Sequence, residues 1–416
     1  MVHYSDYLQL EKVLGAQSPE SDRHGQPAHD EMLFIVIHQA YELWFKQLLF
    51  ETESVIGIMQ QPALNDNSPE LQTVVHRLSR CSTILKVLVH QIDIMETMTP
   101  MDFLDFRDML RPASGFQSWQ FKLLEARLGL KYQHRFGQQY YLSQLRQPEI
   151  DRIRDAEKAP SLLELVNKWL ERMPFFSLPD GAEAMDTTAP APTAMATAAA
   201  FWTDYRLRYL QSLADAEKNN MEGFDRIFFG VTAPHPGSRA AEKGAPIPEE
   251  KDAPAAEPAA RTASCPMGYG SPTDAATGTP MPGSSSATTS DSTATANSGS
   301  SVDAARSLSP SACRSALFIM LYRGYPMLQL PFQVLNQLLE IDEQLSTWRY
   351  RHMSMVHRMI GTRIGTGGST GKDYLGSALA QHHLFKEIAG LTSFLIERKK
   401  LPQLTPEMER RLGFAW

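Results

Sequence analysis

Residues 32–58 read MLFIVIHQAYELWFKQLLFETESVIGI, and this stretch decides the fold class. Its large apolar side chains recur every three or four residues, as Leu33, Ile37, Tyr41, Trp44 and Leu48 do. An α-helix completes a turn in about 3.6 residues, so this spacing places the apolar side chains on one face that packs against a core. We therefore predict a long amphipathic helix here.

The same periodicity continues elsewhere in the chain. Residues 71–98 and 332–360 repeat it over several turns, and 332–360 contains neither glycine nor proline. Residues 374–397 are predicted to form a further helix, although Gly376 and Gly390 interrupt it. Sustained strand-like alternation is absent, so we predict an all-α fold whose helices are long enough for a bundle.

The composition changes abruptly near Val231. From about residue 232 to residue 312 the chain consists mostly of Ala, Ser, Thr, Gly and Pro, and it includes GSSSATTSDSTATANSGSS at 283–301. Such a segment buries too little apolar surface to offset the entropy lost on ordering. We predict a long low-complexity disordered insert at 232–312. It divides a single helical domain into residues 1–231 and 313–416.

Bulk properties exclude several classes of protein. The 416 residues carry a net charge of −7, which argues against nucleic acid as the main partner. Three cysteines are too few for a disulfide framework or a zinc site. The N-terminus has no apolar signal core, and no segment approaches the roughly 20 apolar residues that span a bilayer. We expect no membrane association and a cytoplasmic protein.

His38 is the first candidate for chemistry. It lies four residues after Phe34 on the apolar stripe of 32–58. Residues at i and i+4 share a helix face, so both side chains are expected to project into the interior. Taken alone, this helix favours a core histidine that is hydrogen-bonded to a carbonyl group.

His352 is the second candidate. It lies in the middle of an apolar stripe with intervals of three, four, three and four residues, formed by Leu345, Trp348, His352, Met355 and Met359. His357 lies about 140° further round the helix and faces elsewhere. A neutral histidine among methionines suits an axial haem ligand, but on this evidence alone a core histidine is favoured. The sequence does not decide whether three nearby arginines face solvent or bind haem propionates: Arg349, Arg351 and Arg358.

The loop GTGGSTGK at 365–372 superficially matches a phosphate-binding loop. Thr366 stands where the first glycine is required, Asp373 replaces the Ser or Thr after the lysine, and the loop follows a helix instead of a strand. Two interpretations remain. The loop either terminates a helix or closes over a ligand that the Thr366 hydroxyl and backbone N–H groups reach.

Phe103 and Arg107 open the stretch FLDFRDMLRPASGFQSWQF at 103–121 and are again four residues apart. A turn follows, and Ser114 is expected to cap a helix that ends at Gly129. An arginine beside a helix N-terminus suits a carboxylate ligand. The alternative, a surface salt bridge, is favoured for Arg107 taken alone.

The absence of several known short motifs argues against some types of chemistry. No CxxCH motif is present, so a haem would not be attached covalently. The absence of HExxH, of a CxxC pair and of GxSxG argues against zinc and serine chemistry.

Long ungapped blocks of the chain closely resemble the tryptophan 2,3-dioxygenase family. The blocks are YSDYLQLEKVLGAQ, HDEMLFIVIHQAYELWFKQLLFE, FRDMLRPASGFQSWQFKLLE and PFQVLNQLLEIDEQLSTWRYRHMSMVHRMIGTRIGTGGSTG, followed by YL at Tyr374. They occur in the family's order and cover nearly everything outside the insert. The insert is the departure, because the family has a shorter connection there.

The resemblance implies a role for each candidate residue. His352 is implied to be the proximal haem ligand, and His38 the distal histidine near the indole N–H. The indole pocket is implied to be walled by Phe34 and Phe103. Arg107 is implied to pair with the substrate carboxylate, and Thr366 to contact its ammonium and carboxylate groups. Ser114 is implied to lie near the haem pocket. Tyr4 and Tyr7 are implied to complete the site of a neighbouring subunit.

The resemblance also implies the reaction. A haem b, one per subunit of an intertwined homotetramer, and O2 would convert L-tryptophan into N-formyl-L-kynurenine by cleaving the indole C2–C3 bond, the first step of the kynurenine pathway. Two alternatives remain open from the residues. One is a related haem enzyme, including a monooxygenase, for another aromatic amine or amino acid. The other is a non-catalytic haem-binding scaffold whose insert recruits partners.

Overall fold

The structure is a computed structural model that describes residues 1–135, 142–172, 193–230, 308–363 and 382–413, with the single positions 365, 376 and 379. Within these ranges the regular elements are helices, and no strand is present. The predicted all-α class is therefore confirmed. The described helices are too short or too polar to cross a membrane.

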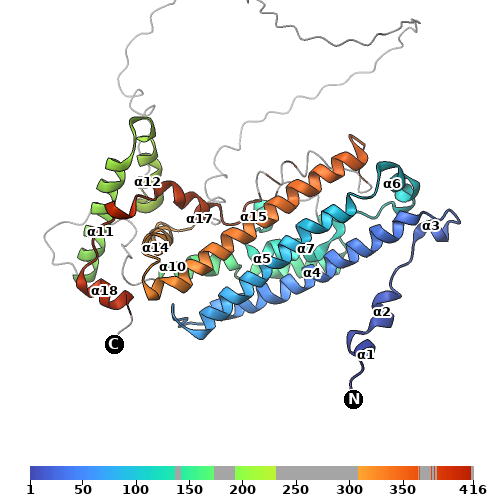
Figure 1. Cartoon of the computed structure of the whole chain (residues 1–416), viewed down its shortest axis with the longest axis horizontal. Helices are drawn as coiled ribbons and strands as arrows, with labels where there is room; N and C mark the ends of the chain where they lie inside the picture. Colours follow the sequence, from blue (N-terminus) through green and yellow to red (C-terminus); the bar gives the residue numbers. More distant parts are fainter. Residues whose placement is uncertain are drawn as a thin grey trace, which may run out of the picture. The chain divides into compact units, whose positions relative to one another are not determined.

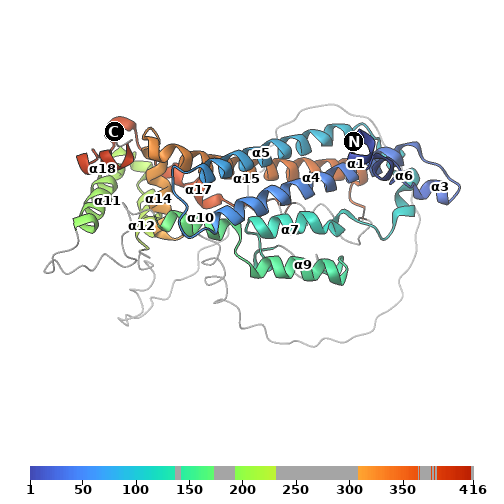
Figure 2. The same cartoon turned by 90° about the horizontal axis from the view of Figure 1, so that it is seen from below.

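Three long helices form the centre of the molecule: α4 (His29–Met59), α5 (Pro69–Met95) and α15 (Pro326–Ile360). They run side by side, with α5 packed against both of the others (Figures 1 and 2). Each corresponds to one of the periodic segments that the sequence analysis identified, although α5 ends at Met95, before the predicted end at residue 98. The bundle brings residues near 38 and residues near 352 into one core although His38 and His352 are 314 positions apart.

Two more helices extend the bundle on one side. α7 (Trp119–Leu128) packs on α4, and α9 (Gln147–Lys158) packs on α7 (Figure 2). α7 ends at Gly129 as predicted. Its φ is +138°, and a Cβ at this position would lie 2.9 Å from the Leu163 Cβ, so only glycine fits.

The N-terminal part and the end of the α4–α5 hairpin consist of short helices. They are α1 (Tyr4–Leu8), α2 (Leu10–Leu14), α3 (Glu20–Arg23) and α6 (Pro100–Arg107). α6 begins with a capping box in which the Thr99 and Asp102 side chains bond each other's backbone N–H groups. This cap fixes where α6 starts, and α6 contacts both α4 and α15.

An aromatic-rich layer lies beyond the other end of the bundle. It contains α10 (Leu162–Glu171), α11 (Thr193–Ser212), α12 (Asn220–Phe229), α14 (Pro310–Leu321) and α18 (Pro406–Leu412). Its largest fully buried side chains include Trp202, Tyr205, Phe224 and Phe228. This layer contains none of the candidate site residues.

The predicted insert lies outside the described residues except for its last five positions. There the chain is already ordered before the expected boundary at Ala312, because Ser309 caps α14 and accepts from the Ala312 N–H at 3.2 Å. The two ends of the insert lie close together. A Cβ placed on Gly230, the C-cap of α12, would be 4.0 Å from the Pro310 Cγ.

The prediction of one helix over 374–397 is wrong for the part that is described. Residues 382–385 are not helical, and only α17 (Lys386–Gly390) and the 3-10 turn η7 (Leu391–Phe394) follow. The buried Asp342 carboxylate accepts the backbone N–H groups of Leu384 and Phe385 at 2.9 and 3.1 Å. These N–H groups therefore bond a side chain of α15 instead of continuing a helix.

Candidate functional site

His38 lies on α4 with its ring against Phe34. The ring centroids are 4.1 Å apart, and the His38 Nδ1 donates to the Phe34 carbonyl oxygen at 2.7 Å. A carbonyl oxygen only accepts, so a neutral His38 carries its proton on Nδ1 and leaves Nε2 as an acceptor. Burial lowers the pKa of His38, which keeps the ring neutral near pH 7.

The expected carbonyl bond is present, but His38 is not a packed core residue. It keeps solvent-accessible surface, whereas Ile37 beside it is 5% exposed. Surrounding protein nevertheless lowers its pKa. The accessible ring is therefore available to a ligand.

An aromatic wall stands beside His38. The rings of Phe34, Phe103 and Phe106 lie within 5.4 to 5.6 Å of one another, in stacked and edge-on pairs. Met355 and Met359 of α15 pack in the same apolar cluster. The end of α4, the short helix α6 and the end of α15 thus meet here, and the predicted pair Phe34 and Phe103 is in contact.

Arg107 and Ser114 follow this wall along the chain. Arg107 ends α6 and is 4% exposed, so its side chain does not lie on the surface as the salt-bridge alternative supposed. Ser114 is half-buried and its Oγ accepts from the Phe116 N–H at 3.3 Å. It caps the short 3-10 turn η2 (Gly115–Gln117), and Ser118 stands at the N-cap of α7, so the predicted cap is one turn removed from the main helix.

His352 lies on α15 and stacks on Trp348, with ring centroids 5.1 Å apart and planes inclined by 3°. Burial, and next to it the charge on His38, lowers the pKa of His352 to about 4. The two histidines are therefore electrostatic neighbours that extend from different helices. His357 is exposed, so the predicted choice of His352 as the inward-facing histidine is confirmed.

The donor groups around His352 fit a haem. Its imidazole is neutral near pH 7, and within the described ranges neither ring nitrogen makes a hydrogen bond. A neutral imidazole whose nitrogens make no hydrogen bond in the described part of the chain suits a haem iron.

The three arginines of α15 that the sequence left open all bind protein groups. Arg349 bonds the Glu125 carboxylate at 2.9 Å. Arg351 bonds Asp93 at 2.6 Å and Glu96 at 2.9 Å, and Arg358 donates to the Glu96 carbonyl oxygen at 2.6 Å. These contacts tie α15 to α5 and α7 and so hold the helix that presents His352.

Sequence reasoning missed a buried ionic cluster centred on Glu125 of α7. Arg135 and Arg349 contact opposite carboxylate oxygens of Glu125 at 2.5 and 2.9 Å, and Lys122 and His382 lie 3.9 Å away. Burial opposes ionisation of Glu125, but the positive charges of Lys122, Arg135 and Arg349 outweigh it and hold the pKa of Glu125 well below its usual range. Each residue looks like an ordinary surface charge in sequence, so no local signal marks the cluster.

Other candidates lie apart from these residues or outside the described ranges. Tyr4 and Tyr7 of α1 are 70% and 75% exposed, and α1 buries none of its residues. Thr366 lies outside the described residues. The structure therefore places His38, Phe34, Phe103 and His352 around one region and leaves the remaining assignments as predictions.

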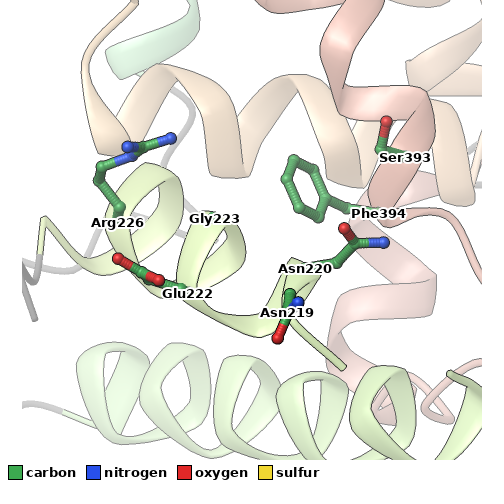
Figure 3. Close-up of a pocket in the computed structure, with 7 residues that line it drawn as sticks. All are labelled: Asn219, Asn220, Glu222, Gly223, Arg226, Ser393 and Phe394. Atoms are coloured by element: carbon green, nitrogen blue, oxygen red, sulfur yellow. The ribbon is translucent and has the colours of Figure 1, made fainter. Parts of the chain in front are cut away.

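A separate hollow of about 360 Å³ lies between α12 and η7 (Figure 3). It is lined by Asn219, Asn220, Glu222, Gly223, Arg226, Ser393 and Phe394. Glu222 and Arg226 are exposed and four residues apart on one helix, so their opposite charges offset each other. None of the predicted site residues lines this hollow, and we assign it no part in the chemistry.

Fold and site together define a class: an all-α protein in which two neutral histidines from separate helices, beside an aromatic wall, suit a non-covalent haem. A model of the tryptophan 2,3-dioxygenase family matches residues 1–183 and 292–395. The chain belongs to the tryptophan 2,3-dioxygenase family, whose members are haem-dependent oxidoreductases.

Full-length relatives agree with this assignment. A tryptophan 2,3-dioxygenase of Bdellovibrio bacteriovorus is 36% identical over 418 residues, which cover 100% of this chain and 99% of the relative. One of Alteromonas mediterranea is 38% identical, with 99% and 97% covered. One of Rattus norvegicus is 34% identical, with 99% and 86% covered. The similarity thus extends along the whole chain.

Proposed function

We propose that this chain adds both atoms of O2 across the indole C2–C3 bond of L-tryptophan and releases N-formyl-L-kynurenine. Family membership over the full length supports this reaction. The observation that carries it in the structure is the pair of neutral histidines, His38 and His352, on facing parts of α4 and α15. The product enters the kynurenine route of tryptophan degradation.

His352 would hold the iron of one haem b per subunit. Burial keeps the imidazole neutral, so a nitrogen lone pair is available for iron without prior loss of a proton. Packing of α15 against α5 through Arg351 and Arg358 holds the ligand in place. When bound, the haem supplies the redox chemistry that O2 requires, while the protein orients the substrate.

His38 is proposed to position the indole. Because its Nδ1 proton is committed to the Phe34 carbonyl oxygen, its Nε2 is left to accept a hydrogen bond from the indole N–H. This role needs no proton transfer, so His38 is a positioning group and not an obligatory base. Phe34 and Phe103 are proposed to pack on the indole and to exclude water from it.

Arg107 is proposed to bind the substrate carboxylate. A buried guanidinium makes strong, geometrically selective hydrogen bonds to a carboxylate because solvent does not compete. Thr366 is proposed to contact the ammonium and carboxylate groups, and Ser114 to lie at the haem pocket. Arg107 and Thr366 are thus proposed to recognise the amino acid end of the substrate, while Phe34 and Phe103 recognise the indole.

The oligomer and its compartment are part of the proposal. Tyr4 and Tyr7 expose most of their aromatic surface on α1, which buries none of its own residues. Exposed aromatic residues of this kind are typical of an interface. We propose that they complete the site of a neighbouring subunit in a homotetramer, and that the enzyme acts in the cytoplasm.

A turnover assay tests the reaction. Purified protein with ferrous haem, O2 and L-tryptophan is expected to form N-formyl-L-kynurenine, identified by mass. Tryptamine and L-tyrosine serve as comparison substrates, because the first lacks the carboxylate and the second lacks the indole. Absence of product from L-tryptophan in haem-loaded protein would refute the proposal. Faster turnover of tryptamine than of L-tryptophan would refute carboxylate recognition.

A further inference from the structure

The ring of Trp348 lies parallel to the ring of His352. The two residues are one helical turn apart on α15, their centroids are 5.1 Å apart, and their planes differ by 3°. Residues at i and i+4 always lie near each other on a helix, but near-parallel rings require that the side-chain rotations of both are set. The stack is therefore a specific feature of this pair.

Trp348 is itself held by aromatic rings from two other helices. Tyr41 and Phe45 of α4 meet it edge-on at 6.1 and 6.4 Å, and Phe121 of α7 lies 5.0 Å away. The Tyr41 hydroxyl donates to the Leu88 carbonyl oxygen of α5 at 2.9 Å, which fixes that ring in turn. The plane of the Trp348 ring is thus set by the bundle and not only by α15.

His352 lacks the usual means of orienting a metal-binding imidazole. Such a histidine ordinarily donates its second ring N–H to a carboxylate or a backbone carbonyl, and this bond sets the ring plane. In the described part of the chain neither nitrogen of His352 makes a hydrogen bond. Something else must set the rotation of the ring about its Cβ–Cγ bond.

We propose that Trp348 is the positioning residue for the haem ligand: its ring, held by Tyr41, Phe45 and Phe121, fixes the plane of the His352 imidazole by stacking. The inference rests on the proposed function, because it takes His352 to be the ligand. Among the described residues, stacking thus takes the place of the customary hydrogen bond in setting the plane of the ligand.

The test compares three haem-loaded variants with the native protein. Trp348→Leu removes the ring, Trp348→Phe keeps a smaller ring, and Phe45→Leu removes a ring that touches Trp348. Phe45→Leu is the matched control, because it loosens the same aromatic cluster and leaves the stack in place. If Trp348→Leu does not fold, Trp348→Met takes its place, since it also lacks a ring and fills more of the volume.

The readouts are the iron–imidazole stretching band of the ferrous protein in resonance Raman spectra and the rate of haem transfer to an excess of a haem acceptor protein. Loss of the stack is expected to broaden or shift the band and to speed haem loss about 2- to 12-fold, the size of an aromatic pair interaction. Trp348→Phe is expected to lie between the native protein and Trp348→Leu. Phe45→Leu is expected to change the band less than Trp348→Leu does, because Tyr41 and Phe121 still hold the Trp348 ring.

Two results would overturn the inference: a native band and native haem-loss rate in Trp348→Leu, or equal broadening in Phe45→Leu. His352→Ala separates this failure from failure of the proposed ligand. If the iron–imidazole band persists in His352→Ala, the ligand assignment is wrong. If the band disappears there and is native in Trp348→Leu, only the stacking role is wrong.

Discussion

Replacing Glu125 with glutamine removes the charge at the centre of the buried ionic cluster while it keeps the shape of the side chain. Glu125 is 1% exposed, and its two carboxylate oxygens contact Arg135 at 2.5 Å and Arg349 at 2.9 Å. Surrounding cations outweigh burial and hold its pKa well below the usual range, so it is ionised at neutral pH. In Glu125→Gln the two guanidinium groups face each other without the intervening charge.

The expected cost follows from burial. Removing one partner of a buried ion pair leaves an uncompensated charge and costs about 3–5 kcal/mol. Glu53→Gln is the matched control, because Glu53 also binds an arginine through both oxygens, Arg127 at 2.6 Å, but is half exposed. Arg127 is 7% exposed, but water reaches the Glu53 carboxylate, so we expect the cost there to be close to that of an exposed pair, about 0.2–1 kcal/mol. Replacing glutamate with glutamine is therefore predicted to lower the free energy of unfolding several-fold more at Glu125 than at Glu53.

Urea denaturation of both variants and the native protein at pH 7, followed by far-ultraviolet circular dichroism, measures this difference. The free energy of unfolding is expected to fall by several kcal/mol in Glu125→Gln and by less than about 1 kcal/mol in Glu53→Gln. Equal losses at the two sites would contradict the reasoning. A loss below about 1 kcal/mol at Glu125 would also contradict it, since the cluster would then be as well solvated as a surface pair.

Further predictions address the substrate, the pH dependence and the insert. Arg107→Ala is expected to raise the Michaelis constant for L-tryptophan by the equivalent of about 1.5–3 kcal/mol, because a charged hydrogen bond to the carboxylate is lost; steady-state kinetics with an unchanged constant would contradict its role. Burial lowers the pKa of His382 to about 3, so the unfolded protein protonates this imidazole more readily than the folded protein does. The stability supplied by the neutral ring is complete above about pH 6.5 and declines as pH falls toward 3, by up to about 1.4 kcal/mol per pH unit. His382→Gln is expected to flatten the acid limb of the stability curve between pH 6.5 and 4, and an identical slope would argue against this assignment. Replacing residues 231–307 with a short glycine–serine linker is expected to leave haem content and turnover nearly unchanged, since Gly230 and Pro310 are already close; loss of turnover would favour a functional role for the insert.

Helical periodicity predicted the long elements and the direction of their side chains. It placed His352 inward and His357 outward, because burial repeats with the helical turn. The same reasoning paired Phe34 with His38, and their rings are in contact. These features depend on neighbours within one helix, which a single sequence displays.

Features that depend on partners far along the chain could not be predicted in this way. Arg349 binds Glu125, which lies 224 residues earlier, and nothing near either residue marks the pair. Residues 382–385 fail to form the predicted helix because Asp342, about forty residues earlier, accepts their backbone N–H groups. Local propensity does not contain such long-range competition for hydrogen bonds.

Isotope labelling of the product tests the central claim most directly. Haem-loaded protein turning over L-tryptophan under 18O2 in ordinary water is expected to give N-formyl-L-kynurenine that carries two 18O atoms, as judged by mass spectrometry immediately after formation. A product that carries a single 18O atom would indicate monooxygenation, and a haem-loaded protein that forms no oxygenated product would indicate a binding role. Either result would contradict the assignment of this chain as a dioxygenase that opens the indole ring.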